Sequence, residues 1–148
     1  MPERTTVLVR LVCRNAPATA SESAAPLRLG VQQGAAVIDD APADAPETIF
    51  TIPLEVRRDL ESGQPRFGGP FAHGAPAARF VYLSWGVRNG ATWQIVRRAK
   101  IHLSRLTWPA IERAVEQGQP IEAIVDLIDA RGRPVSGSVK DAQIEWRV

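Results

Sequence analysis

The chain has 148 residues, of which 45% are hydrophobic and 23% charged, and its formal net charge is +2. This composition is typical of one folded soluble domain over residues 1–148, and it excludes a disordered or fibrous chain. No apolar run approaches the roughly 20 residues that span a bilayer, and the N-terminus lacks a secretion signal. The single Cys13 excludes an internal disulfide. We therefore expect a cytoplasmic protein that does not associate with membranes.

The first part of the chain is dominated by short apolar stretches of the kind that form strands. Strands are predicted over residues 5–13, 27–32 and 47–56. Pro53 restricts the third of these to a sheet edge or a bulge. Residues 15–26 are small and polar, and residues 39–46 combine three Asp with two Pro. Both segments are predicted to be solvent-exposed connections.

A hairpin is predicted where Arg79–Trp85 and Thr92–Val96 flank Asn89-Gly90, the strongest short sequence signal for a two-residue turn. Such a turn would place Tyr82 opposite Arg97, with the guanidinium group against the ring. Apolar residues occupy the odd positions of the second strand, and Arg97 alone breaks this alternation. We therefore expect Arg97 to point toward the core and to pair with a carboxylate. The candidate partners are Asp126, Asp129 and Glu145.

The last part of the chain begins with a predicted helix from Trp108 to Gln117. Thr107 can cap its start, Pro109 fits its first turn and Gly118 can end it. Strands are predicted over residues 121–128, 135–139 and 143–148, with a type I turn at 129–132. The complete pattern is mainly β. It predicts an antiparallel β-sandwich or partly closed barrel of about six to eight strands with one short α-helix at about 108–117.

Charge is distributed unevenly along the chain. Between Glu61 and Glu112 there is no Asp or Glu, whereas seven Arg and Lys and both histidines fall inside this segment. The segment therefore carries +7 and the remainder of the chain −5. This asymmetry indicates either an anionic partner or a basic element that the acidic remainder neutralises.

The sequence does not support enzymatic chemistry. The two histidines stand 29 residues apart in a stretch without carboxylates, which is a poor basis for a metal site. No nucleophile-elbow motif is present, and Gly68-Gly69-Pro70 lacks the Gly-Lys-Ser/Thr of a phosphate loop. Cys13 lies within a predicted strand, which favours a buried apolar role over a nucleophile. We expect no catalytic residue, metal or cofactor.

Candidate binding residues come from the basic segment. His73 lies in a loop rich in Gly and Pro, where it either displays a binding group or packs under a turn. Arg98, Lys100 and His102 form either a contact surface or a solvated strand face that discourages aggregation. The tryptophans are typical of core positions, although the three on predicted strands could also line the mouth of a barrel. The binding candidates are His73, Tyr82, Trp85, Arg98, Lys100, His102 and Arg105, with Arg97, Asn89 and Gly90 as structural residues.

Three stretches carry a family resemblance: Gly69–Gly74, Arg79–Gly86 and Arg97–Ile101. Together they resemble the uncharacterised bacterial domain-of-unknown-function family DUF5990. The resemblance extends to 30–32, 129–132 and 144–146 and leaves the loops 15–26 and 39–46 outside. It implies that the Gly-Pro-Phe loop and the Arg-Arg-Ala-Lys strand are family features, and it implies no activity or cofactor.

Three functional hypotheses follow. The first is a non-enzymatic binding or assembly module that contacts a protein partner or its own copy. The second is a nucleic-acid or phosphate-binding protein in which Arg98, Lys100 and Arg105 contact phosphates while Tyr82 or Trp85 stacks on bases. The third is a small-ligand pocket or weak enzyme around His73, Tyr82 and Trp93.

Overall fold

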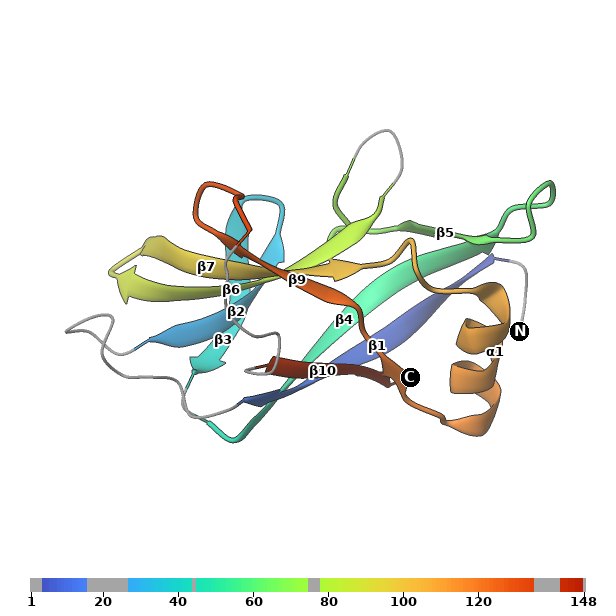
Figure 1. Ribbon diagram of the computed structural model, residues 1–148, viewed down its shortest axis with the longest axis horizontal. Helices are drawn as coiled ribbons and strands as arrows, with labels where there is room; N and C mark the ends of the chain where they lie inside the picture. The colour runs from blue at the N-terminus through green and yellow to red at the C-terminus, as the bar shows by residue number, and fades with distance from the viewer. Residues whose placement is uncertain (1–3, 16–26, 44, 75–77, 135–141, 148) are drawn as a thin grey trace.

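The computed structural model describes residues 4–15, 27–43, 45–74, 78–134 and 142–147. Within these ranges the chain has ten strands, which form two antiparallel five-stranded sheets, and one helix. The sheets lie face to face (Figure 1), and buried side chains from both belong to one core. The predicted antiparallel sandwich is therefore confirmed. The sandwich has more strands than the six to eight predicted, because several strands are short and carry little sequence signal.

The first sheet, sheet A, contains the first and last strands of the described chain. Its order is β5, β4, β1, β10, β8. β1 lies at its centre and pairs antiparallel with β4 on one side and β10 on the other, which confirms the predicted first and last strands. The strands are β1 (Arg4–Asn15), β4 (Glu47–Arg58), β5 (Pro65–Gly68), β8 (Ile121–Glu122) and β10 (Ala142–Arg147).

The second sheet, sheet B, contains the hairpin of the basic segment between Glu61 and Glu112, whereas Arg66 of that segment lies in sheet A. Its order is β3, β2, β6, β7, β9. The strands are β2 (Arg28–Gln33), β3 (Ala36–Pro42), β6 (Phe80–Asn89), β7 (Thr92–His102) and β9 (Val125–Asp129).

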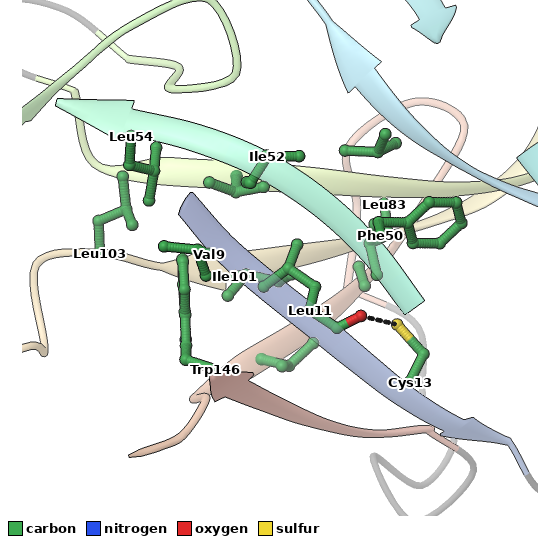
Figure 2. Close-up of a cluster of buried hydrophobic side chains, with 14 of the residues drawn as sticks. Val9, Leu11, Cys13, Phe50, Ile52, Leu54, Leu83, Ile101, Leu103 and Trp146 are labelled. Carbon is green, nitrogen blue, oxygen red and sulfur yellow. Dashed lines mark hydrogen bonds between the residues drawn. The ribbon is translucent and has the colours of Figure 1, made fainter. Parts of the chain in front are cut away.

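Buried and exposed side chains alternate along the strands, and the buried ones form the core between the sheets. In β4, buried residues at every second position are separated by more exposed ones. Figure 2 shows the buried residues of β1 and β4 packed with those of sheet B. The labelled core residues are Val9, Leu11, Cys13, Phe50, Ile52, Leu54, Leu83, Ile101, Leu103 and Trp146. Full burial of each aliphatic or Phe side chain stabilises the fold by about 1.5–3 kcal/mol.

Pro53 lies within β4, where it faces Leu8 of β1. β5 pairs with β4 only over Glu55–Arg58, so the other side of β4 carries no β5 pairing at Pro53. At Pro53, β4 is therefore a local sheet edge, where the missing N–H of proline leaves no hydrogen bond to β5 unmade. This agrees with the predicted edge position.

The helix α1 (Trp108–Gln117) has the predicted boundaries. The hydroxyl of Thr107 accepts a hydrogen bond from the N–H of Ala110 at 3.3 Å, and Gly118 ends the helix with a φ of 65°. Trp108 and Ile111 belong to the shared core. The helix therefore covers one end of the sandwich, near the start of β1 (Figure 1).

The predicted hairpin of β6 and β7 is present, but its turn is displaced by one residue. Asn89 pairs with Thr92, so the two-residue turn is Gly90-Ala91. Gly90 has a φ of 61°, the left-handed conformation that glycine adopts without strain.

A bulge shifts the hairpin register further. Trp85 pairs with Arg97 and the next pair skips Val96, so Val96 is an extra residue on β7. As a result Tyr82 faces Lys100, and the predicted pairing of Tyr82 with Arg97 is wrong. The displaced turn alone would place Tyr82 opposite Ala99, and the bulge moves its partner on to Lys100. The bulge could not be predicted, because it depends on packing between strands, which the turn sequence does not encode.

The acidic segment 39–46 is not entirely the predicted connection, because β3 continues to Pro42 and pairs with β2. Asp39 has a φ of 57° where the register shifts opposite Gly30 and Val31. An acidic, proline-ended strand is tolerated here because β3 is at the edge of sheet B.

The predicted strand 121–128 is two strands in different sheets. β8 pairs with β10 in sheet A, and β9 pairs with β7 in sheet B. The predicted turn follows, with the N–H of Gly132 donating to the carbonyl of Asp129 at 3.0 Å. Residues 135–139, predicted as its second strand, lie outside the described residues. In the described ranges, no helix has the length and apolar character to cross a membrane.

Candidate functional site

The side chains of β6 and β7 divide between the two faces of sheet B. Val81, Leu83 and Trp85 of β6 are buried in the core, so the residues between them point outward. We call this outward surface the aromatic–cation face. It consists of Phe80, Tyr82, Ser84 and Arg88 from β6 and Trp93, Arg98, Lys100 and His102 from β7, with Ser84 fully buried beneath the other side chains.

Arg98 and Lys100 of this face each lie over an aromatic ring. The Cζ atom of Arg98 is 5.3 Å from the centre of the Tyr82 ring. The Nζ atom of Lys100 is 3.9 Å from the centre of the Phe80 ring. All four side chains are half-buried. Each contact contributes about 0.5–1 kcal/mol at an exposed site and more where water is excluded.

Trp93 supplies a third ring, which the bulge at Val96 turns outward. Its indole N–H donates to the hydroxyl oxygen of Ser84 at 3.1 Å, and the Cζ atom of Arg88 is 5.4 Å from its ring centre. The ring packs directly on Gly86, where an added Cβ would lie 2.4 Å from the indole nitrogen. This position therefore requires a glycine.

His73 holds its loop against the face. Its backbone N–H donates to the carbonyl of Phe80 at 2.8 Å, and its carbonyl accepts from Arg79 and Phe80. The ring Nε2 is 3.3 Å from the carbonyl oxygen of Gln32, and the ring meets Tyr82 edge-on with centroids 4.9 Å apart. These contacts match the packing role predicted as one alternative for His73.

His102 and Asp126 form an ion pair when the histidine is protonated. His102 Nε2 lies 2.6 Å from an Asp126 carboxylate oxygen. By contrast, the described residues place no carboxylate in an ion pair with Arg98 or Lys100. The Nε atom of Arg98 is also buried without a hydrogen-bond partner there. Arg98 and Lys100 therefore contact aromatic rings and not carboxylates, although Asp126 of β9 faces Lys100 in the sheet.

Asp40 neutralises the end of the face nearest the hairpin turn. Its carboxylate forms ion pairs with Arg28 and, at 3.3 Å, with Arg88. Partial burial alone would raise the pKa of Asp40, but hydrogen bonds and charge from Arg28 and Arg88 outweigh it. The pKa of Asp40 is therefore lowered, and the carboxylate stays ionised.

Two of the predicted binding residues do not belong to the face. Trp85 points into the core and is only 4% exposed. Arg105 lies in the turn that follows β7 and is exposed. The structure thus brings His73, Tyr82, Arg98, Lys100 and His102 together and leaves these two apart.

Arg97 shares the inward side of β7 with buried residues, as predicted, but its contact differs. Its Cζ atom is 5.1 Å from the centre of the Trp85 ring. Asp126 pairs with His102 and Asp129 with Arg133, so neither forms the predicted ion pair. The third candidate, Glu145, has a side chain outside the described part of the structure.

Cys13 has the buried role that its position in a strand indicated. It is 1% exposed, and its thiol lies 3.9 Å from the carbonyl oxygen of Leu11 (Figure 2). Burial raises its pKa to about 12, so the thiol stays protonated and weakly nucleophilic. Across the described ranges, His, Cys, Asp and Glu form no group of three or more that could hold a metal ion.

Sequence reasoning missed Phe80, Ser84 and Arg88 as members of the face, and it named Trp93 only in the small-ligand hypothesis. The spacing of Phe80, Tyr82 and Ser84 at every second residue was a usable signal, because such residues share one side of a strand. Trp93 could not be assigned in this way, since the bulge reverses the alternation between it and Arg98.

The aromatic–cation face lies within a region that a family model matches. The model, described as a family of unknown function (DUF5990), covers residues 7–148. The chain belongs to the DUF5990 family. This match confirms the resemblance carried by the Gly-Pro-Phe loop and the Arg-Arg-Ala-Lys strand, and it spans both loops that had been left outside. A search among curated proteins found no match. DUF5990 membership therefore assigns no activity, and the function must be argued from the surface itself.

Proposed function

We propose that this protein is a non-enzymatic binding or assembly module whose aromatic–cation face contacts an acidic protein surface, on a partner or on its own copy. The observation that carries the proposal is the pair of half-buried contacts Arg98–Tyr82 and Lys100–Phe80. Aromatic and arginine side chains are enriched at protein interfaces, where they supply most of the binding energy. The two unpaired cations add charge complementarity.

The geometry favours a protein over a nucleic acid as the partner. Binding of single strands relies on aromatic rings whose faces are open for base stacking. Here Arg98 and Lys100 already cover faces of Tyr82 and Phe80. The nucleic-acid hypothesis, which also invokes Arg105, would require these contacts to rearrange.

The third hypothesis, a small-ligand site around His73, Tyr82 and Trp93, has less support. The ring nitrogen of His73 contacts Gln32, and the indole N–H of Trp93 already donates to Ser84. Groups engaged in this way are poor ligand donors.

Light scattering over a concentration series tests self-assembly. The proposal predicts an average mass that rises with concentration and a loss of this rise in Arg98→Gln/Lys100→Gln. The double variant Arg113→Gln/Arg131→Gln removes two exposed arginines elsewhere and should behave like the native chain.

Site-specific photo-crosslinking in cells that express the protein tests the partner. A benzoylphenylalanine in place of Tyr82 should yield protein adducts, whereas the same group in place of Leu60, which is 81% exposed, should not. Absence of both self-association and position-dependent adducts would contradict the proposal. So would monomeric binding of a labelled oligonucleotide whose affinity falls with salt at a logarithmic slope near −2, about −0.7 per phosphate contact.

A further inference from the structure

The outer side of sheet A carries four arginines side by side. Arg4 of β1 faces Arg57 of β4, which faces Arg66 of β5. An antiparallel bridge from Phe67 to the next segment brings Arg79 level with Arg66. Facing residues on neighbouring strands point to the same side, about 5 Å apart. We call Arg4, Arg57, Arg66 and Arg79 the arginine row.

Among the described residues, the arginine row has fewer carboxylate partners than arginines. Like charges that face each other across strands destabilise a sheet. In the described part of the chain, one carboxylate pairs with the row: Asp59, whose Oδ2 lies 2.9 Å from Nη2 of Arg66. A hydrogen bond from the Glu61 N–H and then the contact with Arg66 lower the pKa of Asp59, so it stays ionised. Arg57 and Arg79 form no ion pair with a described carboxylate.

Residues of the arginine row line two clefts. One, of about 390 Å³, is lined by Arg57, Arg66 and Arg79, and the other, of about 500 Å³, by Arg4, Arg57 and Arg66. The described lining of the two clefts contains five arginines and two carboxylates, those of Asp59 and Glu61. Volumes of about 300–1,000 Å³ are typical of small-molecule sites.

We propose that the arginine row binds a small compound that carries two or more phosphate groups. The planar guanidinium fork donates two parallel hydrogen bonds to phosphate, and such charge-assisted bonds are the strongest that side chains make. At about 5 Å between strands, four arginines extend over about 15 Å, which is longer than one phosphate group. Ser62, Gln64 and Ser104 line the first cleft and supply further donors.

The lining of the clefts distinguishes a small phosphorylated compound from a nucleic acid. Phe67 is the one aromatic residue among the described lining residues, and it packs against the core. The clefts therefore offer no open ring on which a base could stack. The site also lies on a different sheet from the aromatic–cation face, so it does not depend on the function proposed for that face.

Isothermal titration calorimetry with sodium tripolyphosphate tests the site. The native protein should bind it saturably at one site per chain. Arg57→Gln/Arg79→Gln should weaken binding at least about tenfold, since each loses charge-assisted hydrogen bonds. Arg113→Gln/Arg131→Gln, with the same change in charge, should bind like the native protein. Arg98→Gln/Lys100→Gln should do so too, which separates this site from the aromatic–cation face.

Measurements on the native chain keep the test independent of how the variants fold. Tripolyphosphate should raise the melting temperature, because a ligand of the folded state stabilises it. Sodium sulfate at the same ionic strength should raise it less. Equal effects of sulfate and tripolyphosphate, unchanged affinity in Arg57→Gln/Arg79→Gln, or tighter binding of a thymidine oligonucleotide than of tripolyphosphate would each overturn the proposal.

Discussion

The two outer surfaces of the sandwich use the same residue type in opposite ways. On sheet B, Arg98 lies over the Tyr82 ring and its Nε is buried. On sheet A, Arg57 is exposed and stands between the facing arginines Arg4 and Arg66. The first arginine is held by its neighbours, and the second is repelled by them.

This difference shows that a count of basic residues does not locate a binding site. The acid-free segment supplies Arg98 to one surface and Arg66 and Arg79 to the other. An arginine contributes to stability when the adjacent strand carries an aromatic ring, and it remains open to bind an anion when the adjacent strand carries another arginine. The two surfaces should therefore respond differently to mutation, pH and added phosphate.

The largest effect is expected from Gly86→Ala, which disrupts the aromatic–cation face at Trp93. The new Cβ would lie 2.4 Å from the indole nitrogen and 2.6 Å from the backbone oxygen of Gln94. Backbone cannot move aside cheaply, so we expect a loss of about 2 to 3 kcal/mol in the free energy of unfolding. Urea denaturation measures it.

Gly90→Ala is the matched control for this substitution. Its Cβ would meet nothing within 4 Å, but the φ of 61° costs about 1 kcal/mol in a residue other than glycine. Equal losses in the two variants would show that Trp93 does not pack against Gly86 in solution.

A smaller effect separates Arg98 from Arg57. Arg98→Gln should lower the free energy of unfolding by about 0.5–1 kcal/mol, because the contact with Tyr82 is lost. Arg57→Gln should leave it unchanged or raise it by a few tenths of a kcal/mol, since repulsion from Arg4 and Arg66 is relieved. Denaturation at low ionic strength measures both. A loss in Arg57→Gln equal to that in Arg98→Gln would argue against an unbalanced row.

The smallest effect concerns Asp40, which balances Arg28 and Arg88 on sheet B. Its pKa is lowered in the folded state from an ordinary value of 3.8. The stability it contributes is therefore present above about pH 4 and is lost as the pH falls through the folded-state pKa. Asp40→Asn should reduce stability at pH 7 by up to about 1 kcal/mol and by less at pH 2 to 3. A native-minus-variant difference that stays constant over this range would contradict the paired state of Asp40.

How far the sequence predicted the fold depended on the range of the interactions involved. The helix was predicted to the residue because Thr107, Pro109 and Gly118 act through local hydrogen bonds and backbone angles. β1 and β4 were predicted because apolar residues recur along most of each twelve-residue strand. β5, with four residues, offered too little pattern, and β3 was hidden by its acidic composition.

The candidate sites were predicted less well, because they depend on register. Tyr82, Arg98 and Lys100 were recognised from charge and composition, but the bulge at Val96 changed their partners. The arginine row was not recognised at all. Arg4 stands 53 residues before Arg57, and the pairing of β1, β4 and β5 together with the bridge at Phe67 places the four arginines side by side.

The most direct measurement is a ¹H–¹⁵N NMR spectrum of the arginine Nε–H groups during titration with tripolyphosphate. Before any addition, the Arg98 signal should be displaced by the ring current of Tyr82, whereas the Arg57 signal should lie near that of an exposed arginine. On titration, the signals of Arg57 and Arg79 should move together and saturate, and that of Arg98 should stay in place. Movement of Arg98 with Arg57 and Arg79 unmoved, or shifts of equal size on both sheets, would contradict the division between a face whose cations lie over aromatic rings and an open arginine row.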